Sequence, residues 1–471
     1  MATRVETDSL GQVRVPADAL WGAQTQRAVE NFPVSGLRQP GEYISTSALI
    51  KHAAAKVNMS LGLLDRRRGE AIMQAAAQIV EGRWRDHFVV DPFQAGAGTS
   101  HNMNTNEVIA NLANEALGGQ RGRYEPVHPN DHVNMAQSTN DFIPTVIRVA
   151  SSRKVRDLLP ALDDLVQAFE KKADEFDDVL KSGRTHLQDA VPVRLGQEFG
   201  AYAEAVRRDR QRIARAADNL RRLGIGGTAT GTGLNCHSQY HEAMVDELSE
   251  LTGIDFRMSE NLFELMQSTA DFVDLSAALR TLAVTLTRIA NDLRLLSSGP
   301  TTGFGEISLP AVQPGSSIMP GKVNPVMAEM LNMVCYHVMG NDQTLAACSQ
   351  AGQLELNVMM PIMAYNLLQS LEILTNGIGA FTERCVGSIR ADVDRCRELA
   401  EHSIGLATAL NPYIGYAAAA KVAQEAVERG VTLRQVVLEK GYLSAEELDE
   451  ILDPFAMTEP GIPGRSSEEE V

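Results

Sequence analysis

The strictest hydrophobic repeat in this chain lies near its middle, between Glu260 and Ser298. Apolar residues recur there at alternating steps of three and four, which is the spacing of a helix that buries one face in a helical bundle. The repeat consists of Phe272, Leu275, Leu279, Leu282, Leu286, Ile289, Leu293 and Leu296. At about 1.5 Å per residue, such a helix would be roughly 55 to 60 Å long. Other long helices must therefore cover it along its length.

Four further segments lack turn residues and are predicted to form long helices. They span residues 158–180, 193–223, 325–349 and 357–389. With the central repeat they predict an elongated helical bundle, and because alternating Val, Ile and Thr patterns are scarce, we expect little sheet. Gly299 and Pro300 end the central helix, and the Gly- and Pro-rich stretch up to Pro325 predicts a long loop. Amphipathic segments at 391–409 and 444–452 predict a small helical C-terminal region.

Composition narrows the class of protein. The 471 residues exceed the usual size of one domain, so two or three core-forming units are expected. A formal net charge of -17 argues against nucleic acid as a partner. The five cysteines are odd in number and form no CxxC pair, which argues against a disulfide framework and a zinc site. Because no signal-like or membrane-spanning apolar stretch is present either, we expect a cytoplasmic protein that contacts no membrane.

Three short motifs suggest other chemistries, and each fits its pattern poorly. Gly224–Ala229 matches a dinucleotide-binding pattern, but it follows a predicted helix where that pattern requires a strand. Gly315–Lys322 resembles a phosphate-binding loop, but Val323 stands where a Ser or Thr would hold magnesium. His237 and His241 would share one face of a helix, yet no neighbouring carboxylate or further cysteine supports a metal site. We therefore predict no metal.

Four polar patches lie within otherwise apolar helical surroundings. They span residues 96–102, 137–141, 183–189 and 315–325. Taken singly, each patch could be a helix cap or a plain connector. Together they supply hydroxyl and amide groups, Lys322 and His186, with few carboxylates, which is a set of donors suited to a small dianion. A small dicarboxylate is the substrate class that these donors predict.

The fourth patch also carries a resemblance. Gly315–Pro325 reads Gly-Ser-Ser-Ile-Met-Pro-Gly-Lys-Val-Asn-Pro and closely resembles the signature of the fumarase/aspartase superfamily. The other three patches match the remaining motif regions of that superfamily in the same order, and the similarity extends from Val5 to Ile451–Thr458. The resemblance implies a mainly α, three-domain fold in which four identical chains share a long central helical bundle. Such a homotetramer would cover the central helix.

On this basis we expect three domains. They are an N-terminal, mostly helical domain at residues 1–139, the long-helix bundle at 140–394 and a small helical domain at 395–471. The tail from Glu459 on, which ends Ser-Ser-Glu-Glu-Glu-Val, is expected to be loose. In this superfamily the active sites are composite, because each is built from segments of different chains.

The resemblance leaves two activities open, aspartate ammonia-lyase and class II fumarate hydratase. Gly96–Ser100 and Gln137–Asn140 are similar to aspartases, since fumarases usually show Gly-Ser-Gly-Thr-Gln and Gln-Ser-Ser-Asn there. Lys171–Phe176 and Met457–Gly461 also resemble aspartases of the bacillary type. The resemblance therefore favours aspartate ammonia-lyase, which forms fumarate from L-aspartate, with the hydratase as the alternative.

Two further motifs do not settle this choice. Thr185-His186 fits both enzyme classes. His128–Asp131 is similar to the secondary anion site of fumarases, although a capped turn before a helix also accounts for it. A non-catalytic role, as in related lens proteins, is a third reading, and the intact fourth patch argues against it.

The resemblance also implies roles for individual residues. Ser316 and His186 would be catalytic, with Ser316 as the proton-abstracting base. The β-carboxylate of the substrate would be bound by Thr99, Ser138, Thr139 and Ser317. The α-carboxylate would be bound by Thr185, His186, Lys322 and Asn324, and the amino group by Asn140 with Thr99 and His186. This scheme needs no cofactor.

Overall fold

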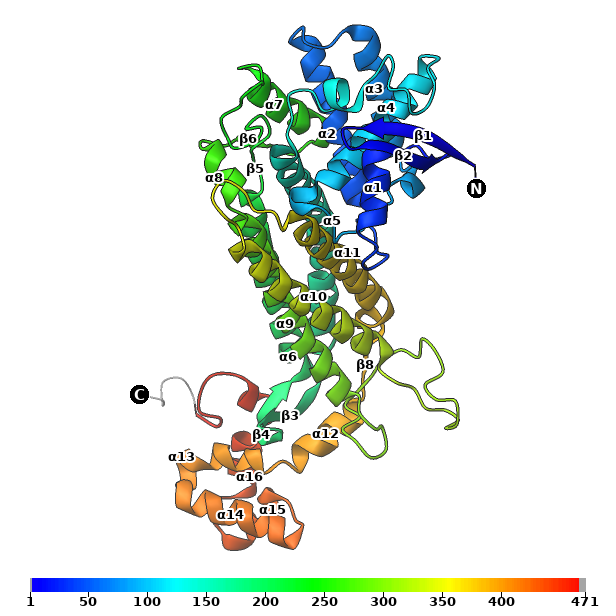
Figure 1. Cartoon of the computed structure of the whole chain (residues 1–471). Helices are drawn as coiled ribbons and strands as arrows, with labels where there is room; N and C mark the ends of the chain where they lie inside the picture. Colours follow the sequence, from blue (N-terminus) through cyan, green and yellow to red (C-terminus); the bar gives the residue numbers. More distant parts are fainter. Residues whose placement is uncertain (1, 466–471) are drawn as a thin grey trace. The chain divides into compact units, whose positions relative to one another are not determined.

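The computed structural model describes residues 2–465, and most of them are helical (Figure 1). The predicted mainly α fold is therefore confirmed. The chain divides into two compact units. Unit 1 comprises the residues up to Pro160, Asp209–Ala283 and Val334–Asn376, and unit 2 comprises Ala161–Arg208, Val284–Met333 and the residues from Gly377 on. The three-domain boundaries after residues 139 and 394 stay a prediction, and the tail at Ser466–Val471 lies outside the described residues.

The long helices carry the predicted apolar repeats, and each contributes residues to both units. They are α5 (Thr139–Glu175), α6 (Leu195–Asn219), α9 (Ala270–Leu296), α10 (Val326–Gln350) and α11 (Met360–Arg384). The whole central repeat is buried on α9, with no side chain more than 7% exposed. In unit 1 the Ser276 hydroxyl donates to Asp342 at 2.7 Å, and in unit 2 the Asn332 amide donates to Asn291 at 2.7 Å. Within each unit α10 therefore lies against α9.

The predicted single helix from Glu260 to Ser298 is wrong at its N-terminal end. Residues Leu262–Gln267 form a separate short helix, α8, and Ser268 is extended. The Thr269 hydroxyl hydrogen-bonds the Ser349 hydroxyl at 2.8 Å, and the Ser268 hydroxyl accepts the Ala270 N–H at 3.3 Å. The local hydrogen bond from Ala270 and the long-range one to Ser349 both compete with a continuous helix. Helix α9 is consequently about 40 Å long.

The other long helices differ from the prediction mainly at their ends. Helix α5 begins at Thr139, well before residue 158, and runs through Pro144 and Pro160. Proline is unfavourable inside a helix, yet both prolines lie within α5. Helices α6 and α11 stop at Asn219 and Arg384, before the predicted residues 223 and 389.

Unit 1 contains further helices around an apolar core. The helices are α1 (Ala23–Asn31), α2 (Gly41–Ser60), α3 (Arg66–Val80), α4 (Thr99–Ala116) and α7 (Tyr240–Thr252), and 3-10 or π turns lie at Arg85–His87, Gly96–Gly98 and Pro129–Val133. The strands are β1 (Thr3–Asp8), β2 (Gly11–Pro16), β5 (Arg222–Leu223) and β6 (Arg257–Met258). Buried members of the core include Ile72, Ile79, Phe88, Val108 and Ile109.

Unit 2 contains the C-terminal helices, of which α12 and α16 lie within the predicted amphipathic segments 391–409 and 444–452. They are α12 (Val393–Glu401), α13 (Asn411–Ile414), α14 (Tyr416–Arg429), α15 (Leu433–Lys440) and α16 (Ala445–Ile451), with 3-10 turns at Val386–Ser388, Ile404–Leu410 and Ala456–Thr458. The strands are β3 (Leu180–Thr185), β4 (Gln188–Arg194), β7 (Ile307–Ser308) and β8 (Arg390–Ala391). Thr432 and Ser444 start α15 and α16 with capping boxes, which satisfy backbone N–H groups that a helix leaves unpaired.

Sheet is a minor component, as predicted. Strands β1 and β2, β3 and β4, and β7 and β8 pair antiparallel, while β5 and β6 pair parallel. Among residues 2–465, no helix combines the length and the apolar character needed to cross a bilayer. None of the five cysteines, all of which lie within the described residues, forms a disulfide bond, and Cys335, Cys385 and Cys396 are buried.

A buried carboxylate anchors the N-terminal end of α1. Glu107 on α4 is only 2% exposed. Its oxygens accept the backbone N–H groups of Gly22, Gln24 and Thr25 at 2.9 to 3.2 Å, and the Thr25 hydroxyl at 2.6 Å. Burial raises the pKa of Glu107 to about 7, although these donors act to lower it. The folded protein therefore holds a proton here that the unfolded chain would release.

This linkage predicts a pH-dependent cost. Because the folded pKa is raised, the Glu107 contribution to the free energy of unfolding should fall between about pH 4.5 and pH 7, by up to about 3 kcal/mol. The Glu107→Gln variant has no such titration. Urea unfolding of both proteins across that range should show the variant gaining stability relative to wild type as the pH rises. A constant difference at every pH would contradict the raised pKa.

Candidate active site

The predicted site residues fall into two groups, one in each unit. Unit 1 holds Thr99 at the first position of α4 and the run Ser138–Asn140 at the start of α5. Gly98, with φ +90°, precedes α4 and packs closely on α5, since a Cβ there would lie 3.0 Å from the Ile143 side chain. The two helix starts are therefore neighbours. The Thr99 side chain is exposed.

A buried aspartate clamps the start of α5. One Asp141 oxygen accepts the Ser138 N–H at 2.8 Å, and the other accepts the N–H groups of Gly226 and Thr228 at 2.9 and 3.0 Å. Burial raises the pKa of Asp141 to about 6, while these N–H groups and Lys51 oppose the rise. The Asp141 carboxylate thereby joins the second polar patch, residues 137–141, to the glycine-rich turn at Gly224–Ala229.

The glycine-rich turn is therefore already occupied by a protein carboxylate. A two-residue strand, β5, precedes this turn, so the predicted preceding helix does not run up to the motif.

The two histidines that could have shared a helical face do not do so. His237 lies before α7, whereas His241 is inside it, so that expectation is wrong. Among residues 2–465, no cluster of three or more metal-ligating side chains occurs.

The clamp also sets the orientation of Asn140. Its amide nitrogen donates to the Ala229 carbonyl at 2.8 Å. Because a carbonyl can only accept, the nitrogen must face Ala229, and the Oδ1 atom of Asn140 faces away as an acceptor. An acceptor in this position suits an N–H or O–H group of a ligand.

Unit 2 presents Thr185 and His186 on the hairpin of β3 and β4. Thr185 pairs with Gln188, so His186 and Leu187 form a two-residue turn with φ +56° and +60°. Two left-handed residues are the requirement of a tight hairpin turn that Asn-Gly normally meets. For residues with a Cβ the left-handed region costs roughly 1–2 kcal/mol each. Both side chains are exposed.

A buried ion cluster holds this hairpin from behind. Arg184 donates to both oxygens of Glu306 at 3.0 and 2.9 Å, and its guanidinium lies 4.2 Å from the centre of the Phe304 ring. Lys181 lies 2.9 Å from Glu198 and 3.7 Å from Glu306, and Glu306 is fully buried. The hairpin is thereby tied to the segment that leads into β7 and on to Ser316.

The Ser316 loop closes on itself. The Gly315 N–H donates to the Lys322 carbonyl at 2.8 Å, and the Asn324 amide donates to the Gly315 carbonyl at 2.7 Å. A Cβ on Gly315 would lie 2.4 Å from the Lys322 carbonyl oxygen, so only glycine fits. Ser316 and Lys322 line one hollow of about 570 Å³. Ser317 and Lys322 are exposed.

The hydroxyl of Ser316 already receives two hydrogen bonds. Its oxygen accepts the N–H groups of Ile318 and Met319 at 3.2 and 3.0 Å. Donors to an oxygen favour its charged form and lower the pKa of the group that carries it. This geometry suits a serine that has to act as a base.

His128 caps the turn that was compared with a secondary anion site. Its Nδ1 atom accepts the N–H groups of Asn130 and Asp131 at 3.3 and 3.2 Å. These hydrogen bonds account for the Pro129–Val133 turn, and the secondary anion site stays an untested alternative.

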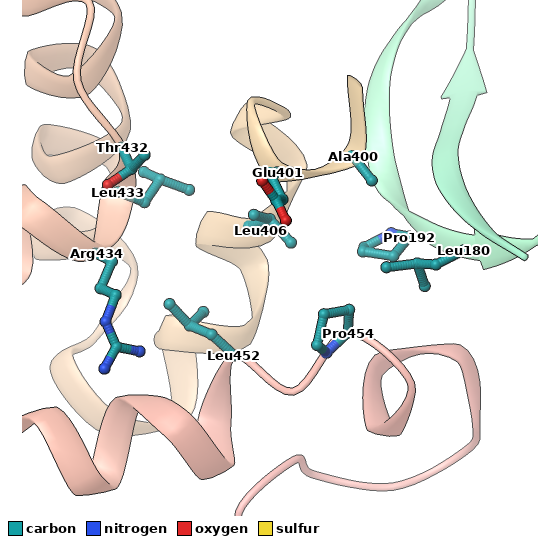
Figure 2. A pocket seen from close by; sticks show the side chains of 10 residues that line it. All are labelled: Leu180, Pro192, Ala400, Glu401, Leu406, Thr432, Leu433, Arg434, Leu452 and Pro454. Atoms are coloured by element: carbon teal, nitrogen blue, oxygen red, sulfur yellow. The ribbon is translucent and has the colours of Figure 1, made fainter. Parts of the chain in front are cut away.

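A separate cavity in unit 2 contains none of the predicted site residues. It measures about 240 Å³ and is lined mainly by apolar side chains (Figure 2). The charged residues Glu401 and Arg434 also line it. Arg434 pairs with Asp449 at 2.6 Å. The cavity lacks the convergent donors that a dicarboxylate needs.

Sequence comparison decides the family. A family described as Lyase matches residues 11–340, and one described as Fumarase C C-terminus matches residues 406–459. The chain belongs to the fumarase/aspartase superfamily. It is an enzyme of the lyase class, and both the predicted resemblance and the predicted fold are confirmed.

Individual members of the superfamily are similar over nearly the whole chain. An aspartate ammonia-lyase from Bacillus sp is 49% identical over 462 residues, which cover 98% of this chain and 99% of the relative. A class II fumarate hydratase from Halobacterium salinarum is 51% identical over 460 residues, covering 98% of each. The crystal structure of a fumarate lyase:delta crystallin from Brucella melitensis has a TM-score of 0.93 and 50% identity, covering 98% of this chain and 100% of that one. Identity alone does not separate the two activities.

Lys51 was not among the predicted site residues and lies directly behind the unit 1 group. Lys51 is fully buried on α2, in line with the buried residues Ile44, Ala48 and Ala55. These positions are separated by four, three and four residues, so Lys51 shares one face of α2 with three apolar core residues. A lysine at this spacing from apolar residues was the signal in the sequence that could have identified it.

Because His186 lies in a left-handed turn, a substitution there should affect the free energy of unfolding and the turnover in different ways. Asparagine tolerates the left-handed region better than histidine, so His186→Asn should leave the free energy of unfolding unchanged or raise it by up to about 1 kcal/mol. The loss of the imidazole should lower turnover by about 10²-fold or more. Urea unfolding and the ultraviolet absorbance of the unsaturated product measure the two effects.

Leu187→Asn is the matched control for this prediction. It relieves the same backbone conformation one residue away and keeps the imidazole, so it should be at least as stable as wild type and retain turnover. Full activity of His186→Asn would remove His186 from the catalytic residues.

Proposed function

We propose that this enzyme is an aspartate ammonia-lyase, which reversibly eliminates ammonia from L-aspartate to give fumarate. The aspartase-like motifs Gly96–Ser100 and Gln137–Asn140 carry the choice. The similarity to the Bacillus sp aspartate ammonia-lyase supports it. Class II fumarate hydratase is the alternative, supported by the comparable identity to the Halobacterium salinarum enzyme.

The barrier to this reaction lies in an intermediate with extra negative charge. Removing a proton from the carbon beside the β-carboxylate moves an electron pair into that carboxylate. The pair then forms the double bond as the C–N bond breaks and ammonia leaves. Donors preorganised around the carboxylate lower the barrier, and each is worth about 10² to 10³ in rate. We assign this task to Thr99, Ser138, Thr139 and Ser317.

Ser316 takes the proton in this scheme. The N–H groups of Ile318 and Met319 on its oxygen support this role, because they stabilise the deprotonated hydroxyl. The α-carboxylate is assigned to Thr185, His186, Lys322 and Asn324. The outward-facing Oδ1 of Asn140 accepts from the amino group, with Thr99 and His186 beside it. No cofactor takes part in the scheme.

The active unit is proposed to be a homotetramer with composite sites. Exposed apolar side chains on the bundle helices support this, since large exposed apolar patches mark interfaces. They include Val284 on α9 at 55% exposure, and Met333 and Tyr336 on α10 at 65% and 54%. Each site would combine the Thr99 and Ser138–Asn140 group, the Thr185-His186 hairpin and the Ser316 loop from different chains.

One substrate comparison tests the proposed reaction. Purified protein should form fumarate from L-aspartate and not from L-malate, as followed by ultraviolet absorbance. Fumarate from L-malate alone would establish the hydratase instead.

Ser316→Ala should lower the rate of fumarate formation from L-aspartate by about 10² to 10⁴ while the protein stays folded and binds substrate, since only proton transfer is removed. A variant that keeps more than about a tenth of the activity would contradict Ser316 as the base.

Subunit mixing tests the composite site. Ser316→Ala and Thr185→Ala should each be inactive alone. If each site draws these two positions from different chains, equal mixing after joint unfolding should restore about one site in four, and roughly a quarter of wild-type activity. Light scattering confirms that tetramers have formed. Recovery no greater than for the variants refolded separately would show that one chain supplies both positions.

A further inference from the structure

The buried Lys51 ammonium is surrounded by amide oxygens within unit 1. Its nitrogen lies 2.8 Å from the side-chain oxygen of Asn102 and 3.0 Å from those of Asn134 and Gln137. The ammonium also lies 3.8 Å from the centre of the Phe142 ring. Three N–H groups meet three acceptors, so the hydrogen-bonding capacity of the cation is fully used. Burial lowers the pKa of Lys51 well below its ordinary value, and Asp141 opposes this shift.

Two partners determine which way the Asn102 amide points. Lys51 Nζ donates to the Oδ1 atom of Asn102, and the Oδ1 atom of Asn134, which can only accept, lies on the other side. The amide nitrogen of Asn102 then points to the other side, where it donates to Asn134 Oδ1 at 3.1 Å and to Thr139 Oγ1 at 3.2 Å. Both of its N–H groups are used. Asn102 is 2% exposed, so no exchange with bulk water competes with this arrangement.

The neighbouring amides reinforce the same direction. The Asn134 nitrogen donates to the Gln137 backbone carbonyl at 3.1 Å, so its oxygen must face Lys51 and Asn102. The Gln137 nitrogen donates to the carbonyls of Val133 and Met135 at 3.2 and 3.1 Å. Every amide in the network is therefore oriented by a group that can play only one role.

The direction of the hydrogen bond between Asn102 and Thr139 decides whether the Thr139 hydroxyl can donate to a ligand. A hydroxyl has one hydrogen to donate, and the Thr139 oxygen already accepts from Asn102. Among residues 2–465 the Thr139 hydroxyl donates to no acceptor, so its hydrogen is free for a ligand. Hydrogen bonds in series polarise one another, and here the series begins at a buried cation.

We propose that Asn102, oriented by Lys51, is a positioning residue that keeps the Thr139 hydroxyl as a hydrogen-bond donor to the substrate carboxylate. This inference rests on the proposed function, in which Thr139 binds the carboxylate that gains charge. If Asn102 presented its oxygen instead, the Thr139 hydroxyl would donate to that oxygen and be lost to the substrate. Asn102 itself does not touch the substrate.

The Asn102→Asp variant reverses this hydrogen bond with almost no change in shape. One carboxylate oxygen still accepts from Lys51, and the other replaces the amide nitrogen beside Thr139. Since a carboxylate cannot donate, Thr139 should turn its hydrogen toward Asp. We expect kcat/KM for L-aspartate to fall by about 10²-fold, with kcat carrying most of the loss, as expected for a donor that acts in the transition state.

A double-mutant cycle with Thr139→Val distinguishes positioning from a general structural defect. If Asn102 acts through Thr139, then Asn102→Asp combined with Thr139→Val should be no slower than the worse single variant. Losses that multiply, or Asn102→Asp retaining more than about a third of wild-type kcat/KM, would overturn the proposal. Lys51→Met provides a second cycle, with the same expected outcomes, if Asn102→Asp does not fold.

Asn106→Asp is the matched control. Asn106 is a buried neighbour on α4 whose amide donates to Asn134 Oδ1 at 3.2 Å and does not contact Thr139. It introduces the same charge into the same network, so activity per folded enzyme should stay within about 3-fold of wild type, and its loss should multiply with that of Thr139→Val. A loss equal to that of Asn102→Asp would overturn the proposal. Wild-type enzyme inactive on L-aspartate would instead contradict the proposed function, before any variant is compared.

Discussion

The apolar stripe on α9 is the constraint that the rest of the structure follows. Eight large side chains along about 40 Å must be kept from water, and helices of similar length are the elements that can cover such a stripe. The candidate residues lie at the ends of helices and in the connections between them: at the starts of α4 and α5, in the hairpin before α6 and in the loop before α10. Rigid helices thus hold the short segments that contain the candidate site residues.

Behind two of these segments, the start of α5 and the hairpin, lie buried charged groups with a fixed set of partners. Asp141 holds the start of α5 against the glycine-rich turn, Lys51 holds the amides beside Thr139, and Glu306 holds the hairpin through Arg184. A buried charge without partners would be very unfavourable, so these groups tolerate few alternative arrangements. Their benefit is orientation: they determine which atoms of the neighbouring side chains remain available to a ligand.

The sequence was sufficient for the features that depend on repetition. The α9 repeat, the long loop before Pro325 and the C-terminal helices α12 and α16 were predicted from local patterns alone. The break at Ser268 was not, because it depends on a hydrogen bond from Thr269 to Ser349, which is distant in sequence. The predicted start at residue 158 lies well inside α5, which also contains Pro144 and Pro160 although proline is unfavourable inside a helix.

The site residues came from a resemblance, and their orientation could not. No pattern reveals that Asn140 presents its oxygen or that Asn102 presents its nitrogen to Thr139, since each depends on a partner far along the chain. The left-handed turn at His186 and Leu187 was equally hidden, because neither residue type favours it. What sequence conveys about this site is therefore its composition, and what the fold adds is the direction of each hydrogen bond.

The buried thiols give this protein built-in reporters of its own opening. Cys385 and Cys396 lie in unit 2, and burial raises the pKa of each to about 12. Cys335, on α10 in unit 1, is also buried. A thiol-specific reagent meets a reactive thiolate only when the surrounding structure opens. The order in which the three sites become labelled would then rank the local stability of α10, the end of α11 and α12 without any introduced probe.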